Sequence, residues 1–189
     1  MAVGVLAVQG AVREHLEALR RIGVAAGPVR TPEEIAASEA LILPGGESTA
    51  IGKLMARYGL LQPVQDLVAS GRPVLGTCAG AILLAKRIES AAADQPALGL
   101  MDIAVERNAF GRQVDSFEAD LDFAGLDGVP FRAVFIRAPI IKPVGEDVQV
   151  LATHGSSVAA ARQGRMLALS FHPELTSDPR IHQYFLSMG

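Results

Sequence analysis

Cys78 is the only cysteine in this 189-residue chain and lies in the sequence Gly-Thr-Cys-Ala-Gly at residues 76–80. A short apolar run precedes it, and a run typical of a helix follows. Small residues on both sides allow the tight strand-to-helix turn of a G-x-S-x-G nucleophile motif, here with sulfur in place of oxygen. Cys78 is therefore predicted to attack a carbonyl, and the backbone N–H of Ala79 would face the resulting oxyanion. The alternative, a small buried apolar residue, is disfavoured by the paired glycines.

A base for this nucleophile is predicted in the sequence SFHPELT at residues 170–176. His172 and Glu174 follow an apolar run, and in an extended chain side chains two residues apart point the same way. Glu174 could then contact His172 while Pro173 stiffens the backbone between them. A nucleophile needs a base, and the base needs an acceptor that fixes its tautomer. Taken alone this pair is weak evidence, because both residues could be surface residues.

A third motif, LILPGGEST at residues 41–49, places two glycines after a predicted strand. Gly45 and Gly46 would allow backbone N–H groups to approach a substrate and supply a second oxyanion donor. The alternative is a glycine turn in which Ser48 or Thr49 caps the next helix, and both interpretations can hold together. The spacing of a phosphate-binding G-x-x-x-x-G-K-[ST] loop is lacking.

The remaining histidines, His15, His154 and His182, are scattered along the sequence without the spacing of paired metal ligands. We expect them to be structural or surface residues and predict no metal site.

Apolar β-branched runs predict buried strands, and apolar residues three or four apart predict helices. In the first half these elements alternate: a strand at 3–8, a helix at 11–23, a strand at 39–46, one or two helices at 49–71, a strand at 72–76 and a helix at 79–88. This alternation favours an α/β fold with a largely parallel sheet and helices on both faces. Ligands bind such sheets where the strands end, which is where all three motifs fall.

The second half has short strand-like runs between residues 100 and 171, expected to form antiparallel edge strands or a small accessory sheet. A loop is predicted at 89–96. Residues 177–189 are predicted to form a closing helix, with Asp178 as N-cap and Pro179 at the first helical position. No linker or internal repeat is evident, so residues 1–189 are expected to form one domain.

The composition is that of a globular protein, with 50% hydrophobic and 20% charged residues and a net charge of −3. This charge leaves no basic footprint for nucleic acid or an anionic membrane. One cysteine cannot form an internal disulfide and fits a reducing compartment. The N-terminus lacks the basic region of a signal peptide, and no apolar stretch reaches the roughly 18–20 residues of a membrane span. We therefore expect a cytoplasmic protein.

Six motifs between residues 7 and 176 are AVQGAVREH, LPGGEST, GTCAG, VERNAFGRQVDSFE, FIRAP and SFHPELT. Together they resemble the triad-type (class I) glutamine amidotransferases, whose elbow cysteine is followed far downstream by His-Pro-Glu. Within that group they are similar to the PdxT/SNO family, the glutaminase subunits of pyridoxal 5′-phosphate synthase. The long VERNAFGRQVDSFE motif is specific to that family. The resemblance implies a three-layer, flavodoxin-like sheet.

The resemblance also implies hydrolysis of L-glutamine to L-glutamate and ammonia. Cys78 would form a γ-glutamyl thioester, His172 would activate the thiol and then protonate the departing ammonia, and Glu174 would orient His172. Matching positions imply that glutamine is bound by Gly46, Glu47, Ser48, Arg107, Ile136 and Arg137. An arginine suits the substrate α-carboxylate, and the sequence leaves open which one. Gln9 matches the family glutamine near the oxyanion hole and the partner interface.

The partner implied by the resemblance is a TIM-barrel synthase subunit that combines ammonia with a pentose phosphate and a triose phosphate. Ammonia released into neutral water is mostly protonated, so a protected path is expected, as is weak activity without the partner. No cofactor is implied, because pyridoxal phosphate would be the product of the complex.

Three alternatives stay open at this point. The chain could be the glutaminase of another amidotransferase, such as imidazole glycerol phosphate synthase, or a free-standing cysteine hydrolase of γ-glutamyl compounds. The third, a non-catalytic subunit, is disfavoured because such a chain should lack part of the triad, whereas Cys78, His172 and Glu174 are all present.

Overall fold

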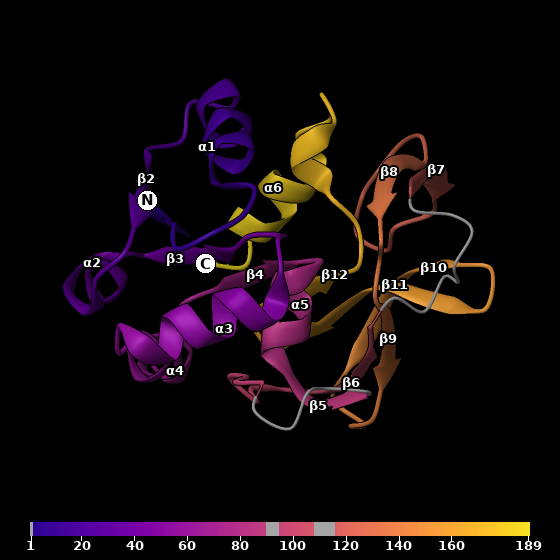
Figure 1. The fold of residues 1–189 in the computed structure, drawn as a ribbon. Helices are drawn as coiled ribbons and strands as arrows, with labels where there is room; N and C mark the ends of the chain where they lie inside the picture. Colours follow the sequence, from indigo (N-terminus) through magenta and orange to yellow (C-terminus); the bar gives the residue numbers. More distant parts are fainter. Residues whose placement is uncertain (1, 90–94, 108–115) are drawn as a thin grey trace.

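The computed structural model describes residues 2–89, 95–107 and 116–189 (Figure 1). The strands are β1 (Val3–Leu6), β2 (Ala26–Val29), β3 (Ala40–Leu43), β4 (Val74–Thr77), β5 (Ala85–Glu89), β6 (Met101–Glu106), β7 (Ser116–Leu121), β8 (Phe131–Ile136), β9 (Ile140–Pro143), β10 (Gln149–His154), β11 (Ser157–Gln163) and β12 (Met166–Leu169). The helices are α1 (Val12–Arg21), α2 (Pro32–Ala37), α3 (Ser48–Arg57), α4 (Leu61–Ala69), α5 (Ala79–Leu84), the 3₁₀ turn η1 (Pro173–Leu175) and α6 (Arg180–Leu186).

The main sheet has the order β2-β1-β3-β4-β12-β11-β9-β6-β5, with β10 paired to β11. Its first five strands are mutually parallel. From β12 onward the pairings with β11, β9 and β6 are antiparallel, and β7 with β8 forms a separate antiparallel pair. The expected mostly parallel α/β sheet with antiparallel additions is confirmed.

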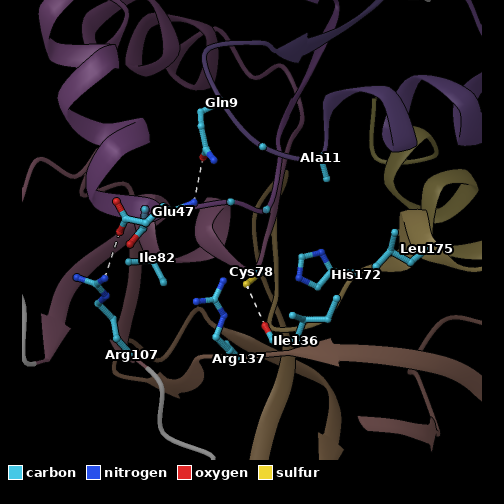
Figure 2. A pocket seen from close by; sticks show the side chains of 14 residues that line it. Gln9, Ala11, Glu47, Cys78, Ile82, Arg107, Ile136, Arg137, His172 and Leu175 are labelled. Carbon is cyan, nitrogen blue, oxygen red and sulfur yellow. Dashed lines mark hydrogen bonds and ion pairs between the residues drawn. The ribbon is translucent and has the colours of Figure 1, made fainter. Parts of the chain in front are cut away.

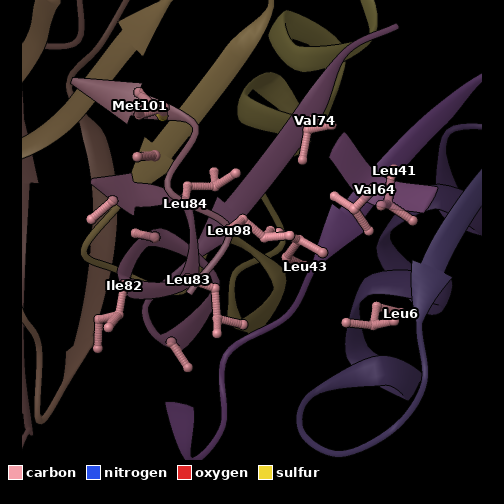
Figure 3. Close-up of a cluster of buried hydrophobic side chains, with 14 of the residues drawn as sticks. Leu6, Leu41, Leu43, Val64, Val74, Ile82, Leu83, Leu84, Leu98 and Met101 are labelled. Carbon is pink, nitrogen blue, oxygen red and sulfur yellow. The ribbon is translucent and has the colours of Figure 1, made fainter. Parts of the chain in front are cut away.

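Helices cover both faces of the parallel strands, so β1, β3 and β4 are buried along their whole length. Along β3, Leu41 and Leu43 pack into one core cluster, toward α3, α4 and α5 (Figure 3). Ala40 and Ile42 point to the opposite face and join a second cluster that includes residues of α1 and α6. A strand buried on both faces reads as a continuous apolar run, which is why these strands could be predicted.

The helix expected at 79–88 is confirmed over residues 79–84 and is wrong from residue 85 onward. The structure has a six-residue helix, α5, and then strand β5, which pairs in parallel with β6. Every residue of α5 is buried, whereas Lys86 and Arg87 are exposed. The chain leaves the helix at Ala85, and pairing with β6 overrides the helical preference of these residues.

Three elements were not predicted: β2, α2 and β9. The capping box formed by Thr31 and Glu34 is a sequence signal for the start of α2, and it would have allowed this helix to be predicted. Helix α6 begins at Arg180, one residue later than expected, with Pro179 and not Asp178 as the N-cap, although Asp178 still accepts the N–H of Arg180 at 3.0 Å. Most of the loop predicted at 89–96 and residues 108–115 of the VERNAFGRQVDSFE motif lie outside the described residues.

No helix within the described ranges is long and apolar enough to cross a membrane.

The turn from β4 into α5 leaves no space for side chains at its glycines. A Cβ at Gly80 would lie 2.0 Å from the carbonyl oxygen of Leu43 in the adjacent strand. A Cβ at Gly76 would lie 2.6 Å from the carbonyl carbon of Gly80. These contacts are to backbone, which cannot rotate away, so the turn requires glycine at both positions.

We expect Gly80→Ala to lower the free energy of unfolding by about 3 kcal/mol, because β3 and α5 must separate to admit the methyl group. Gly27→Ala is the matched control, since a Cβ at Gly27 meets no atom within 4 Å, and it should change stability by less than about 0.5 kcal/mol. Urea denaturation of both variants measures the difference. Equal stabilities would contradict the close packing at the turn.

Candidate active site

The three neighbouring parallel strands β3, β4 and β12 place the predicted catalytic segments at one edge of the sheet. The register pairs Leu43 of β3 with Gly76 of β4, and Thr77 of β4 with Leu169 of β12. The chain beyond each strand therefore emerges at the same edge, bringing together Gly45 and Gly46, Cys78, and His172 (Figure 2). They line a pocket of about 430 Å³.

Cys78 has a backbone conformation that L-residues rarely adopt, with φ 50° and ψ −101°. Its N–H donates to the carbonyl of Leu169 at 2.8 Å, which holds the turn against β12. The sulfur faces the carbonyl oxygen of Ile136 at 3.9 Å, and the residue is only 8% exposed. Strain of this kind persists where the surrounding structure enforces it, and it is common at catalytic positions.

His172 and Glu174 are in direct contact, with Nδ1 2.8 Å from Oε1. The expected extended backbone between them is wrong, because Pro173–Leu175 forms the turn η1 and the turn itself brings the side chains together. The N–H of His172 donates to Val134 of β8 at 2.8 Å. A Cβ at Gly45 would lie 2.4 Å from Cε1 of His172, so glycine is required for the ring to occupy this place.

The electrostatics favour a protonated His172 and an ionised Glu174. Burial opposes protonation of His172, but hydrogen bonds with Cys78 and Glu174 outweigh it and raise its pKa to about 10. Burial likewise opposes the charge of Glu174, yet the adjacent His15 and His172 lower its pKa. Contacts with neighbouring side chains, rather than with water, therefore stabilise the charged forms of His172 and Glu174.

A second row of polar side chains lies behind Glu174, and sequence reasoning missed it. His15 of α1 and His182 of α6 are buried, with His15 Nδ1 3.1 Å from His182 Nε2. His15 Nε2 lies 3.1 Å from Thr77 Oγ1 and 3.4 Å from Glu174 Oε2. Burial lowers the pKa of His15. Burial also lowers the pKa of His182, to about 3, and repulsion between the two rings would further oppose protonation of both at once. His15 and His182 were expected to be structural or surface residues, and the structure places both of them in the interior.

The loop before α1 packs directly on Gly45 and Gly46. The N–H of Ala11 donates to the carbonyl of Gly45 at 3.0 Å, and the Gln9 side-chain oxygen accepts the N–H of Glu47 at 3.0 Å. Because N–H and C=O point in opposite directions in a trans peptide, the N–H of Gly46 faces away from this loop.

Opposite Cys78 the pocket is walled by a polar cluster around Arg107. Its guanidinium donates to Gln95 at 2.7 Å and Thr49 at 3.2 Å, and lies 3.3 Å from the carboxylate of Glu47. Glu47, rather than Ser48 or Thr49, caps α3 by accepting the N–H groups of Thr49 and Ala50. Gln95 also donates to Ser48 at 3.2 Å, a contact that no signal in the sequence indicated.

Arg137, which follows β8, points into the pocket from another side (Figure 2). It has a left-handed backbone, with φ 43°. Within the part of the chain that the structure describes, its guanidinium makes no hydrogen bond or ion pair, unlike that of Arg107. Among the residues described, the charge of Arg107 is therefore balanced by Glu47, whereas the charge of Arg137 has no carboxylate beside it.

Most of the predicted site residues line this single pocket: Gln9, Gly46, Glu47, Ser48, Cys78, Arg107, Ile136, Arg137 and His172. Glu174 lies behind His172 and contributes no pocket surface, and Ala79 begins α5 beneath Cys78. A thiol, an imidazole and a buried carboxylate in this order are equipped for acyl transfer through a covalent intermediate. Among the residues described, no group of three acidic, histidine or cysteine side chains could hold a metal ion.

Comparison with known proteins gives consistent matches along the chain. Residues 5–189 match the SNO glutamine amidotransferase family. A protein of Roseiflexus sp. (strain RS-1) named pyridoxal 5′-phosphate synthase subunit PdxT is 57% identical over 189 residues, which cover 100% of both chains. A protein of the same name from Pelotomaculum thermopropionicum is 59% identical over 186 residues, covering 98% of this chain and 94% of the relative.

Solved structures agree in fold. A crystal structure described as a glutamine amidotransferase matches with a TM-score of 0.93 and 55% identity, over 98% of this chain and 97% of the other. The PurLQS structure from Thermotoga maritima has a TM-score of 0.69 and 19% identity over 98% and 97% of the two chains, a likeness of fold alone.

The buried histidines make stability dependent on pH. Unfolded His182 takes up a proton near its ordinary pKa of 6.5, but the folded chain resists protonation until about pH 3. Stability is therefore fully present above pH 6.5 and is lost as the pH falls, because the unfolded state then binds more protons. His182 alone should lower the free energy of unfolding by about 2 kcal/mol between pH 7 and pH 5, and His15 acts in the same direction.

The variant His182→Gln keeps a neutral hydrogen-bonding side chain and should remove about 2 kcal/mol of this pH dependence. Urea denaturation of both proteins at the two pH values measures the loss. If the variant lost as much stability as the unmodified chain, His182 would not be the titrating group.

Proposed function

The chain belongs to the SNO glutamine amidotransferase family, and from this we propose that it hydrolyses L-glutamine to L-glutamate and ammonia for the synthesis of pyridoxal 5′-phosphate. The observation that carries the proposal is the convergence of Cys78, His172 and Glu174 at the ends of adjacent strands, beside a pocket of about 430 Å³. The proposal treats residues 1–189 as one glutaminase domain.

In the proposed reaction the proton that His172 holds comes from the thiol of Cys78, and the sulfur attacks the side-chain amide carbon of glutamine. The backbone N–H groups of Gly46 and Ala79 stabilise the tetrahedral oxyanion. The carbon–nitrogen bond then breaks, and the imidazolium of His172 protonates the leaving nitrogen, giving ammonia and a γ-glutamyl thioester. Water activated by the neutral ring hydrolyses the thioester to L-glutamate and restores the thiol. Glu174 accepts the Nδ1 hydrogen bond and so keeps the ring oriented.

We assign the α-carboxylate of glutamine to Arg137. Its guanidinium lines the pocket without an anionic partner among the residues described, whereas Arg107 already faces Glu47. A planar guanidinium can bind a carboxylate through two parallel hydrogen bonds. We assign the substrate's α-ammonium to Glu47, the one carboxylate among the described residues that line the pocket, and Gly46, Ser48, Arg107 and Ile136 complete the wall around the substrate.

The proposed partner is the TIM-barrel synthase subunit, which receives ammonia through a protected path. The relatives are named as subunits of pyridoxal 5′-phosphate synthase, which favours this acceptor over that of another amidotransferase or a free-standing hydrolase. Gln9 touches both the pocket and the backbone of Glu47, so a partner docked at the loop before α1 would bear directly on the oxyanion site. The proposal includes no cofactor on this chain, and a cytoplasmic location stays a prediction.

Glutamate release from L-glutamine should rise at least about tenfold when the synthase subunit is added, and Cys78→Ala should abolish it in both conditions, because no other thiol is present. A coupled glutamate dehydrogenase assay measures both. Full turnover without the partner would indicate a free-standing hydrolase, and no turnover in any mixture would indicate a non-catalytic subunit.

Arg137→Gln should raise the KM for glutamine about 10- to 100-fold with kcat changed less than about threefold, because it removes a charge-assisted contact made in both ground and transition states. Arg132→Gln is the matched control: Arg132 lies on β8, the strand that precedes Arg137, but pairs with Glu118 and Asp120 on the surface. Steady-state kinetics with the synthase subunit present decide the matter. A KM effect in Arg107→Gln but not in Arg137→Gln would assign the carboxylate to Arg107.

A further inference from the structure

The second oxygen of Glu174 needs a donor that the triad does not supply. Oε1 accepts from His172, but Oε2 is buried and makes no well-aligned hydrogen bond in the described part of the chain. A buried carboxylate oxygen without a donor is costly. The polar atom facing it is Nε2 of His15, at 3.4 Å.

The proton positions around His15 follow from its neighbours. Complete burial lowers the pKa of His15, so the ring is neutral at neutral pH and carries one N–H. A lone pair on Nε2 would face the negative charge of Glu174, so the hydrogen belongs on Nε2. Nδ1 is then an acceptor, and His182 must donate to it from its own Nε2, 3.1 Å away.

This assignment leaves one ring atom of the pair without a partner, Nδ1 of His182. In the assigned tautomer that atom is an acceptor rather than an N–H. Thr77 Oγ1, 3.1 Å from Nε2 of His15, shares the same hydrogen. One arrangement of protons therefore accounts for the contacts of the His15 ring with Thr77, Glu174 and His182.

We propose that His15 is a positioning residue for the glutaminase reaction: it donates from Nε2 to Oε2 of Glu174, and His182 fixes the required tautomer. The inference rests on the proposed function for its kinetic readout. His15 lies one helical turn beyond the Gln9–Ala11 loop that packs on Gly45 and Gly46. The loop before α1 thus contacts the reaction centre beside Gly45 and Gly46, and the helix itself contacts it beside Glu174.

The test compares His15→Leu with His15→Gln, because glutamine can place an N–H near the position of Nε2 and leucine cannot. With the synthase subunit present, His15→Leu should lower kcat about 10- to 100-fold and leave KM within about threefold. His15→Gln should stay within about fivefold of the unmodified enzyme. A residue that served only to fill space would not distinguish the two substitutions in this way.

A second readout does not depend on glutamine turnover. Alkylation of Cys78 by iodoacetamide at pH 7 measures how reactive the sulfur is beside His172 and Glu174. It should be about tenfold slower in His15→Leu and nearly unchanged in His15→Gln. If glutamine were not the substrate, this pattern would persist while glutamate release failed, so the two proposals can fail separately.

Equal rates in both variants, whether both normal or both low, would overturn the positioning role. If His15→Leu does not fold, the same assays on His182→Leu and His182→Gln decide, because only glutamine can donate to Nδ1 of His15. His182→Leu should then be at least about threefold slower than His182→Gln in both assays, and equal rates would overturn the proposal.

Discussion

The site depends on how closely backbone packs against backbone where β4 ends. Gly80 lies against the carbonyl of Leu43, and the N–H of Cys78 is held by Leu169. With β3 on one side and β12 on the other, the chain turns into α5 through the strained conformation of Cys78. The same three strands end in the segments that hold Gly45 and Gly46, Cys78, and His172. The packing that exposes the sulfur therefore also fixes its distance from the glycine pair and from the imidazole.

The features that could be predicted from the sequence are local ones. Strands buried on both faces are continuous apolar runs, and each chemical motif is a contiguous string at the end of such a strand. Cys78, His172 and the glycine pair could therefore be placed at one edge without knowledge of side-chain contacts. The fold class followed from the alternation of strands and helices in the first half of the chain.

The features that were missed depend on partners distant in the sequence. Nothing around His15 indicates that Glu174 and His182 will lie against it, because α1, η1 and α6 meet only after folding. Strand β5 was taken for helix since its residues suit a helix, and the pairing with β6 decides otherwise. Gln95 was assigned to a plain loop, although it joins Ser48 to Arg107.

The two outermost strands of the main sheet, β2 and β5, bear on how the protein avoids unwanted association. An unpaired strand edge is a template for another chain. In β2, Pro28 removes a backbone donor from the exposed rim. In β5, the exposed Lys86 and Arg87 place charge on the opposite rim. Both rims thus discourage strand addition and fibre growth at these two ends of the main sheet.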